Sequence, residues 1–144
     1  MNRKLESLKV YTDGAARGNP GPAACAFLYV HNNEIIYSEV SYIGNATNNQ
    51  AEYQAIINAM KKVGSFHAKH IKIFSDSKLV IQQLNRKWKI NVPHLSKLSS
   101  QVFQMIDKFE KVDFFHVRRN NSFIQKCDLL CNERLDNEGI KGKS

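Results

Sequence analysis

The chain has 144 residues, of which 42% are hydrophobic and 24% are charged, and its formal net charge is +8. A chain of this length can bury a real core, so we expect one domain over residues 1–144. No apolar run is long enough to span a bilayer and no signal-peptide pattern opens the chain, which predicts no membrane partner. The basic balance is compatible with a polyanionic partner but does not identify one.

The three cysteines bear on the compartment. Cys25, Cys127 and Cys131 include no CxxC pair, and two thiols one helical turn apart make a poor zinc site without further ligands. Small buried thiols in a reducing compartment are the better interpretation. We therefore expect a cytoplasmic protein.

Three strands are expected first along the chain. The run LKVYT (8–12) predicts a buried strand. The runs AACAFLYV (23–30) and EIIYSEVSYIG (34–44), separated by HNN, predict a hairpin. Together they favour an antiparallel meander.

A helix follows over residues 45–64, since Thr47 and Gln50 fit a capping box at its start and Gly64 follows its last apolar position. The remaining elements alternate: a strand at 71–75, a helix at 76–84, a loop at 85–93, a helical stretch in 94–109, a strand at 112–117 and a helix at 122–138. This order predicts an α/β fold with a mixed sheet and helices on its faces. Ligand sites in such sheets tend to lie outside the carboxyl ends of strands.

Four carboxylates occupy places where a solvated acid is not expected. Asp13 and Asp76 follow predicted strands, whereas Glu52 and Asp128 share helix faces with apolar residues, so we expect both to point inward. Burying a lone ionised carboxylate is expensive unless something compensates it. A divalent cation held by several carboxylates is one such compensation.

Each acid also has a simpler interpretation. Asp76 could cap a helix, and Asp13 before a glycine could be a turn residue. Glu52 could gain from the helix dipole, although it lies beyond the first turn, and Asp128 could tilt toward solvent. Taken together, the four acids favour a shared metal site.

The same residues lie within four longer motifs: YTDGAARGNPGP (11–22), ATNNQAEYQAI (46–56), IFSDSKLVIQQLNRKWK (73–89), and HVRRN with KCDLLCNERLD between 116 and 136. In this order they resemble type I ribonuclease H, the family that hydrolyses the RNA strand of RNA–DNA hybrids. The likeness spans nearly the whole chain. It is greatest to compact stand-alone forms that lack an inserted basic helix.

The resemblance implies a ribonuclease H-like α/β fold, with a five-stranded mixed sheet made of a three-strand antiparallel meander plus parallel strands, and helices on both faces. It implies that Asp13, Glu52, Asp76 and Asp128 are the catalytic, metal-binding acids of a two-metal-ion reaction. Oxygen-only ligands suit two Mg²⁺ ions per active site with substrate, for which Mn²⁺ can substitute. The products would carry 3′-hydroxyl and 5′-phosphate ends.

The resemblance also implies substrate-binding residues. Gly14 and Asn19 in the first turn, with Asn48 and Gln50 at the helix start, match positions that meet the RNA strand, where the 2′-hydroxyl distinguishes RNA from DNA. The helix entrance alone would also explain Asn48 and the nearby Asn45, and Thr47 is already a credible N-cap.

A second group matches positions that hold phosphates. Thr47, with Asn45 nearby, matches a pocket for a DNA-strand phosphate at a helix N-terminus. Trp88 and Lys89 match a DNA-strand contact, although a solvated basic loop with one core tryptophan explains them as well. Arg118 or its neighbour Arg119 could assist near the scissile phosphate, or serve only the surface.

One departure from the family is clear. Many members carry a histidine in the loop before the last acid, whereas RRNNSFIQK (118–126) has none, which puts the rate and metal preference in doubt. We expect a monomer that cleaves RNA–DNA hybrids without sequence preference, with double-stranded RNA as a further partner. Two alternatives are a catalytically weak or inactive module that binds hybrid or double-stranded RNA, and the nuclease domain of a reverse transcriptase. The motifs lie within a few residues of both ends, which favours a free-standing protein.

Overall fold

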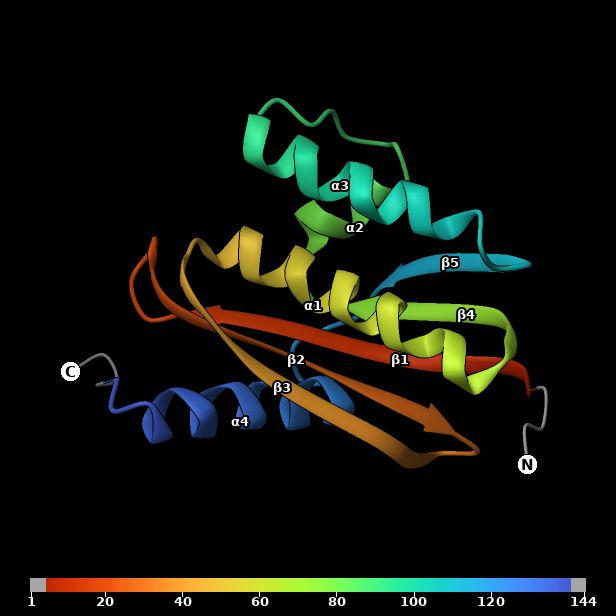
Figure 1. Ribbon diagram of the computed structural model, residues 1–144, viewed down its shortest axis with the longest axis horizontal. Coiled ribbons are helices and arrows are strands. Elements are labelled where there is room, and N and C mark those ends of the chain that lie inside the picture. Colours follow the sequence, from red (N-terminus) through yellow and green to blue (C-terminus); the bar gives the residue numbers. More distant parts are fainter. Residues whose placement is uncertain (1–4, 141–144) are drawn as a thin grey trace.

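A computed structural model of the chain describes residues 5–140 (Figure 1). Its elements are β1 (Leu5–Ala16), β2 (Gly21–His31), β3 (Glu34–Ala46), α1 (Asn48–Val63), a 3₁₀ turn η1 (Gly64–Phe66), β4 (Ala68–Ser75), α2 (Lys78–Leu84), α3 (Pro93–Ile106), β5 (Lys111–His116) and α4 (Ser122–Asn137). Within the described range no helix is both long and apolar enough to cross a membrane. The outermost four residues at each end of the predicted domain, 1–144, lie outside that range.

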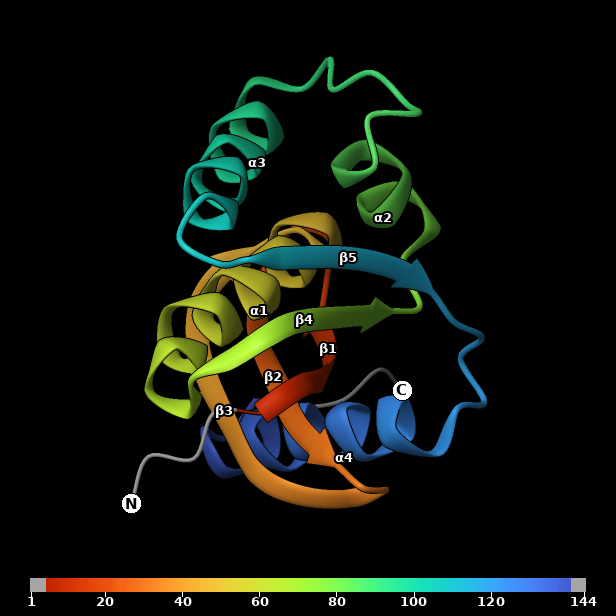
Figure 2. The ribbon, with the colours of Figure 1, turned by 90° about the vertical axis from the view of Figure 1, so that its right-hand side faces the viewer.

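The strands form one mixed sheet in the order β3-β2-β1-β4-β5. β1, β2 and β3 pair as an antiparallel meander, and β4 and β5 extend the sheet from β1 in parallel register. The predicted five-stranded mixed sheet is therefore confirmed. Figure 2 shows α1 and α3 on one side of this sheet and α4 on the other.

Two apolar clusters hold the layers together. One joins α1, α2 and α3 to a sheet face through side chains such as Val10, Ile56 and Ile73. The other joins α4 to the opposite face through Leu28, Cys127 and similar residues. Alternate residues of each strand point to opposite faces, so one sheet supplies both clusters.

The first strand is longer than its sequence predicts. β1 runs from Leu5 to Ala16 instead of residues 8–12, so Asp13 lies inside a strand and not in a turn. The physical reason is that β2 continues to pair with β1 as far as Ala16, whereas the parallel ladder with β4 ends at Tyr11 opposite Phe74. Beyond Tyr11, the β1 backbone therefore pairs with β2 alone, and the last link to β4 is the Thr12 hydroxyl, which donates to the Phe74 carbonyl at 3.1 Å.

Candidate active site

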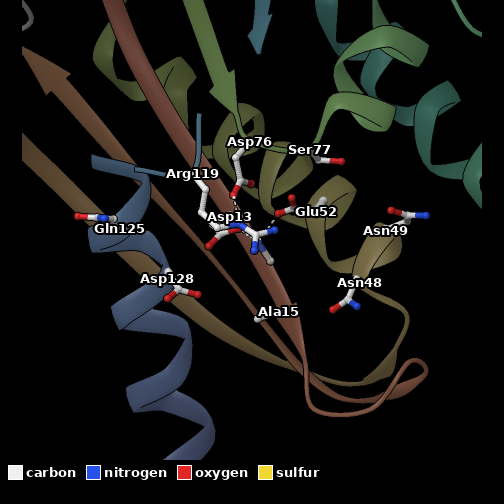
Figure 3. Close-up of a pocket in the computed structure, with 11 residues that line it drawn as sticks. Asp13, Ala15, Asn48, Asn49, Glu52, Asp76, Ser77, Arg119, Gln125 and Asp128 are labelled. Carbon is white, nitrogen blue, oxygen red and sulfur yellow. Dashed lines mark hydrogen bonds and ion pairs between the residues drawn. The ribbon is translucent and has the colours of Figure 1, made fainter. Parts of the chain in front are cut away.

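Three acidic side chains meet where β1 extends past β4. Asp13 comes from β1, Glu52 from α1, and Asp76 follows the last residue of β4; one carboxylate oxygen of each lies within 4.8 Å of the others. Asp13 is 6% exposed and Glu52 8% exposed, so two of the acids are buried. Figure 3 shows the three carboxylates turned toward one another.

The helix start brings Glu52 to the sheet because it is well capped. The Thr47 hydroxyl accepts the Gln50 N–H at 3.1 Å, and the Gln50 side chain accepts the Thr47 N–H at 2.8 Å, which confirms the predicted capping box. Gly14 lets the helix approach β1, since a Cβ on this residue would lie 2.3 Å from the carbonyl carbon of Ala51. A side chain at position 14 would push Glu52 away.

Asp76 does not cap the following helix, α2. The N-cap of α2 is Ser77, whose hydroxyl accepts the Val80 N–H at 3.3 Å, while the Ser75 hydroxyl accepts the Ser77 N–H at 3.0 Å. The capping explanation of Asp76 is therefore wrong. Its carboxylate, at the carboxyl end of β4, faces the other acids.

Burial and mutual repulsion perturb the two innermost acids. The Gly14 N–H donates to Asp13 Oδ1 at 3.0 Å and to Glu52 Oε1. Burial, followed by the charges of Asp76 and Asp128, raises the pKa of Asp13 to about 7, although the neighbouring Glu52 carboxyl opposes this. Burial and the adjacent Asp13 raise the pKa of Glu52 well above its ordinary value. Ionising the whole cluster is costly unless a cation joins it.

Asp128 lies at the rim of this cluster and not within it. The inward orientation expected for this residue is wrong, because its side chain is exposed. The buried stripe of α4 consists of Ile124, Cys127, Cys131 and Leu135. Asp128 is one residue beyond that stripe, and a helical period read from Ile124 fits positions 127 and 128 about equally well.

The acids line a cleft of about 610 Å³, and Asp128 borders the same cleft. Other lining residues are Gly14, Ala15, Asn48, Asn49, Ser77, Arg119 and Gln125. The sequence analysis did not select Ser77 or Gln125. Ser77 adjoins Asp76 and Gln125 lies one helical turn before Asp128, so their positions next to predicted acids could have identified both. The cleft is therefore acidic at its base and polar around its rim.

Of the two candidate arginines, Arg119 is the one that reaches the acids. Arg119 Nε lies 3.5 Å from Asp76 Oδ2, and Figure 3 shows its side chain beside Asp13 and Asp76. Arg119 is 93% exposed, so it is available to an anion that enters the cleft. Arg118 is exposed and is not among the residues that line the cleft.

Two asparagines fix the loop between β1 and β2 against the start of α1. Asn19 Oδ1 accepts the Asn48 N–H at 2.9 Å, and Asn48 Oδ1 accepts the Ala16 N–H at 3.0 Å. Because both amide oxygens are turned to backbone donors, the amide nitrogens point away from them. The Asn48 N–H₂ group is thus left as a hydrogen-bond donor at the wall of the cleft, and the Asn19 N–H₂ group is left as a donor in the adjoining loop.

Arg17 anchors the same loop on its other side. Its guanidinium lies 2.8 Å from Asp136 Oδ1 and donates to the Asn132 carbonyl at 3.3 Å and to the Ile140 carbonyl. These partners belong to the end of α4 and the residues after it. The loop that carries Asn19 is therefore held between the start of α1 and the end of α4.

The remaining predicted contact residues are not among those that line the cleft. Asn45 is an exposed residue near the end of β3, opposite Pro22 of β2. Trp88 is 43% exposed, so it is not a core tryptophan, and the Lys78 ammonium lies 5.9 Å from its ring centre. A shallow hollow beside Trp88 also includes Lys89.

Comparison with known proteins agrees with this geometry. Residues 11–132 match the family described as Reverse transcriptase-like. Ribonuclease HI of Halobacterium salinarum is 39% identical over 127 residues, which cover 88% of this chain and 63% of that protein. Related mycobacterial proteins are 33% identical, and the chain spans only 35% of their length.

Solved structures show the same fold. The crystal structure of RNase H1 from Halobacterium salinarum superimposes with a TM-score of 0.85 at 37% identity, covering 91% of this chain and 98% of that one. LC11-RNase H1, crystallised in complex with an RNA/DNA hybrid, gives a TM-score of 0.84 at 30% identity, covering 91% of this chain and 98% of that one. The chain therefore belongs to the type I ribonuclease H family.

Proposed function

We propose that this chain is an endoribonuclease that hydrolyses the RNA strand of RNA–DNA hybrids without sequence preference, leaving 3′-hydroxyl and 5′-phosphate ends. The observation that carries the proposal is the cluster of Asp13, Glu52 and Asp76 at the base of an open cleft. The RNA/DNA hybrid bound by LC11-RNase H1, a relative of the same fold, supports the choice of substrate.

The donor set fits divalent cations. Asp13, Glu52 and Asp76 offer only carboxylate oxygens, which suit Mg²⁺, with Mn²⁺ as a substitute. The raised pKa values of Asp13 and Glu52 show that the cluster is electrostatically unsatisfied on its own. We propose two ions in the presence of substrate, with Asp128 at the rim as the fourth acid. Held by these acids, such a pair would supply activation of the attacking water and stabilisation of the charge on the leaving 3′ oxygen.

The chain's own residues orient the RNA strand. The amide nitrogens of Asn19 and Asn48 can donate to 2′-hydroxyl oxygens and to base-edge acceptors of the RNA strand. DNA lacks the 2′-hydroxyl groups. Donors that meet sugars and shared minor-groove acceptors discriminate little between bases, which accounts for sequence-independent cleavage. Gly14 adds no side chain between the β1 backbone and the RNA strand. Arg119 offers its guanidinium to the phosphate near Asp76.

The DNA strand would lie across the start of α1 and the loop after α2. The α1 N-terminus, capped by Thr47 and Gln50 with Asn45 nearby, is a favourable place for a phosphate. Trp88 and Lys89 present an exposed ring and a cation, which suit a sugar-phosphate backbone. We assign Arg118 to the same non-specific attraction of phosphates.

The proposal extends to the oligomeric state, the compartment and a second substrate. The enzyme acts as a monomer in the cytoplasm, where its three buried thiols stay reduced, and double-stranded RNA is a second substrate. The competing function is a binding module that recognises hybrid or double-stranded RNA with little or no hydrolysis.

Cleavage of an end-labelled RNA–DNA hybrid separates these functions. Mg²⁺ should support cleavage by the wild type, EDTA should abolish it, and Asp76→Asn should bind the hybrid without cutting it. Products should accept a label from polynucleotide kinase only after phosphatase treatment, because their 5′ ends carry phosphate. Duplex RNA and duplex DNA define the substrate range. No Mg²⁺-dependent cleavage by the wild type would leave only the binding module.

A further inference from the structure

Among residues 5–140, no helix covers the β4–β5 part of the sheet face on the α4 side. α4 packs mainly against β1, β2 and β3, and Figure 2 shows β4 and β5 lying beyond it. Strand alternation places on this face the residues that flank the buried Ile71, Ile73 and Phe114. We define the open face by Ser7 and Lys9 of β1, His70 and Lys72 of β4, and Lys111, Asp113 and Phe115 of β5.

On the side nearest the active site, an aromatic row leads from beneath α4, where Tyr11 contacts Phe123, out to Phe115 on the open face. Phe74 stacks on Tyr11 with ring centres 4.8 Å apart, and Phe115 stacks on Phe74 at 5.2 Å. Phe115 ends this row on the edge strand and is 41% exposed. Asp13 and Asp76 lie two residues beyond Tyr11 and Phe74, so the row is close in sequence to the acidic cluster, although its rings do not line the cleft. An exposed ring held by stacking is a platform for a nucleobase.

The next row carries unpaired positive charge. Lys9 and Lys72 are direct register partners in the parallel β1–β4 ladder, and neither has an acidic partner among residues 5–140. The Asp113 carboxylate, which follows in the same row, is instead 2.7 Å from His70 Nε2 and 3.8 Å from Lys111 Nζ. Like charges directly opposite in a sheet are destabilising, and an anion between the two lysines would relieve that repulsion.

A polar hollow continues the surface toward the β2–β3 hairpin. It has a volume of about 390 Å³, and Lys9 lies on its wall together with Ser7, Val30, His31, Asn32 and Asn33. Hydroxyl, amide and ammonium groups of this kind donate to phosphate oxygens. Lys9 therefore connects the lysine row to a second set of donors.

We propose that the open face is a second nucleic-acid site, which binds single-stranded DNA or RNA that continues beyond the hybrid in the cleft. A base stacks on Phe115, and the following phosphates lie against Lys72 and Lys9 before the strand reaches the hairpin hollow. Stacking and backbone neutralisation do not depend on sequence or on the 2′-hydroxyl, so both kinds of strand fit. The enzyme would thereby hold the single-stranded flank of a partly paired substrate.

Fluorescence anisotropy of labelled oligo(dT) and oligo(U) in EDTA tests this site without cleavage. A saturating blunt-ended hybrid fills the cleft, so the oligonucleotide reports only on a separate site. Lys9→Glu with Lys72→Glu should weaken binding by about 10-fold and lower the salt slope by about 1.4, at roughly 0.7 per lost phosphate contact. Phe115→Ala should weaken it by about 5-fold or more. Cleavage of the blunt hybrid should not change in either variant.

The charge-matched control is Lys61→Glu with Lys108→Glu, which removes two exposed lysines on the α1 side of the sheet. Equal loss of binding in this control and in the Lys9–Lys72 variant would show that net charge alone acts, and would overturn the proposal. Displacement of the oligonucleotide by the blunt hybrid would also overturn it, since the strand would then occupy the cleft. If the glutamate variant does not fold, Lys9→Gln with Lys72→Gln provides the same comparison. If the wild type does not cleave the hybrid in Mg²⁺, the proposed function is refuted, but the result of this binding experiment still stands.

Discussion

Replacing Gly14 with alanine should damage both stability and catalysis, because one methyl group would displace the start of α1. The new Cβ would lie 2.3 Å from the Ala51 carbonyl carbon, 2.5 Å from its oxygen and 2.6 Å from the Glu52 nitrogen. All three atoms belong to the backbone, so no side-chain rotation relieves the contact. Ordinary contact begins at 3.4 Å, so the helix must move by about 1.1 Å.

The expected magnitudes follow from that displacement. Overpacking of this kind costs about 1–3 kcal/mol of unfolding free energy. Glu52 moves with the helix, and a misplacement of about 1 Å at a reacting site can lower the rate by about 100-fold. Urea denaturation gives the first quantity, and kcat for a labelled hybrid in Mg²⁺ gives the second.

Gly64→Ala is the matched control for this substitution. A Cβ at Gly64 meets nothing within 4 Å, and its φ of −55° suits alanine, so stability should stay the same or rise by about 0.4–1 kcal/mol. Wild-type stability and activity in Gly14→Ala would refute the steric reasoning. A loss of stability without a loss of activity would show that the helix position does not determine the function of Glu52.

Three further predictions concern the charged groups of the site. Because the pKa of Asp13 rises from 3.8 to about 7 on folding, its contribution to stability is complete below pH 3.8 and is lost as the pH rises through 7. Unfolding free energy in EDTA should therefore fall over that range in the wild type but less in Asp13→Asn, and Mg²⁺ should reduce the fall; equal pH profiles would contradict this. Arg17→Met should cost about 1.5–3 kcal/mol in urea denaturation through its lost charge-assisted hydrogen bonds and should raise the KM for hybrid; unchanged values would show that the loop needs no anchor. Arg119→Ala should lower kcat by about 10-fold, less than the loss of a buried donor, whereas Arg118→Ala should affect only KM; equal effects in steady-state kinetics would remove the distinction.

Local signals made much of the fold predictable. The hairpin, the strand order along the chain and the Thr47–Gln50 capping box each depend on residues within a few positions of one another. The exposure of Trp88 was not predictable in this way, because a tryptophan among cations fits a core or a surface position equally well. Arg118 and Arg119 posed the same difficulty, since only the path of the loop after β5 decides which one turns toward Asp76.

The error at Asp128 has a geometric origin. A helix has 3.6 residues per turn, so both the third and the fourth residue after Ile124 lie near its face. The continuation through Cys127, Cys131 and Leu135, each four residues apart, determines the buried stripe and leaves Asp128 at its border. Exposure does not weaken the proposed role of Asp128, because an exposed side chain can change its rotamer to reach a ligand, whereas the buried acids are fixed in place.

The misassigned end of β1 explains why the site forms where it does. An aspartate followed by glycine is a common turn signal, yet here the strand continues because β2 pairs with it through Ala16. On the other edge the β4 ladder has already ended at Tyr11, so the Asp13 backbone is held by β2 while its β4 side is open to Asp76 and the cleft. Glycine at position 14 then serves the approach of α1 and not a turn. Two ladders of unequal length thus place a rigid carboxylate at an open edge, which is the arrangement that a site binding cations and phosphates requires.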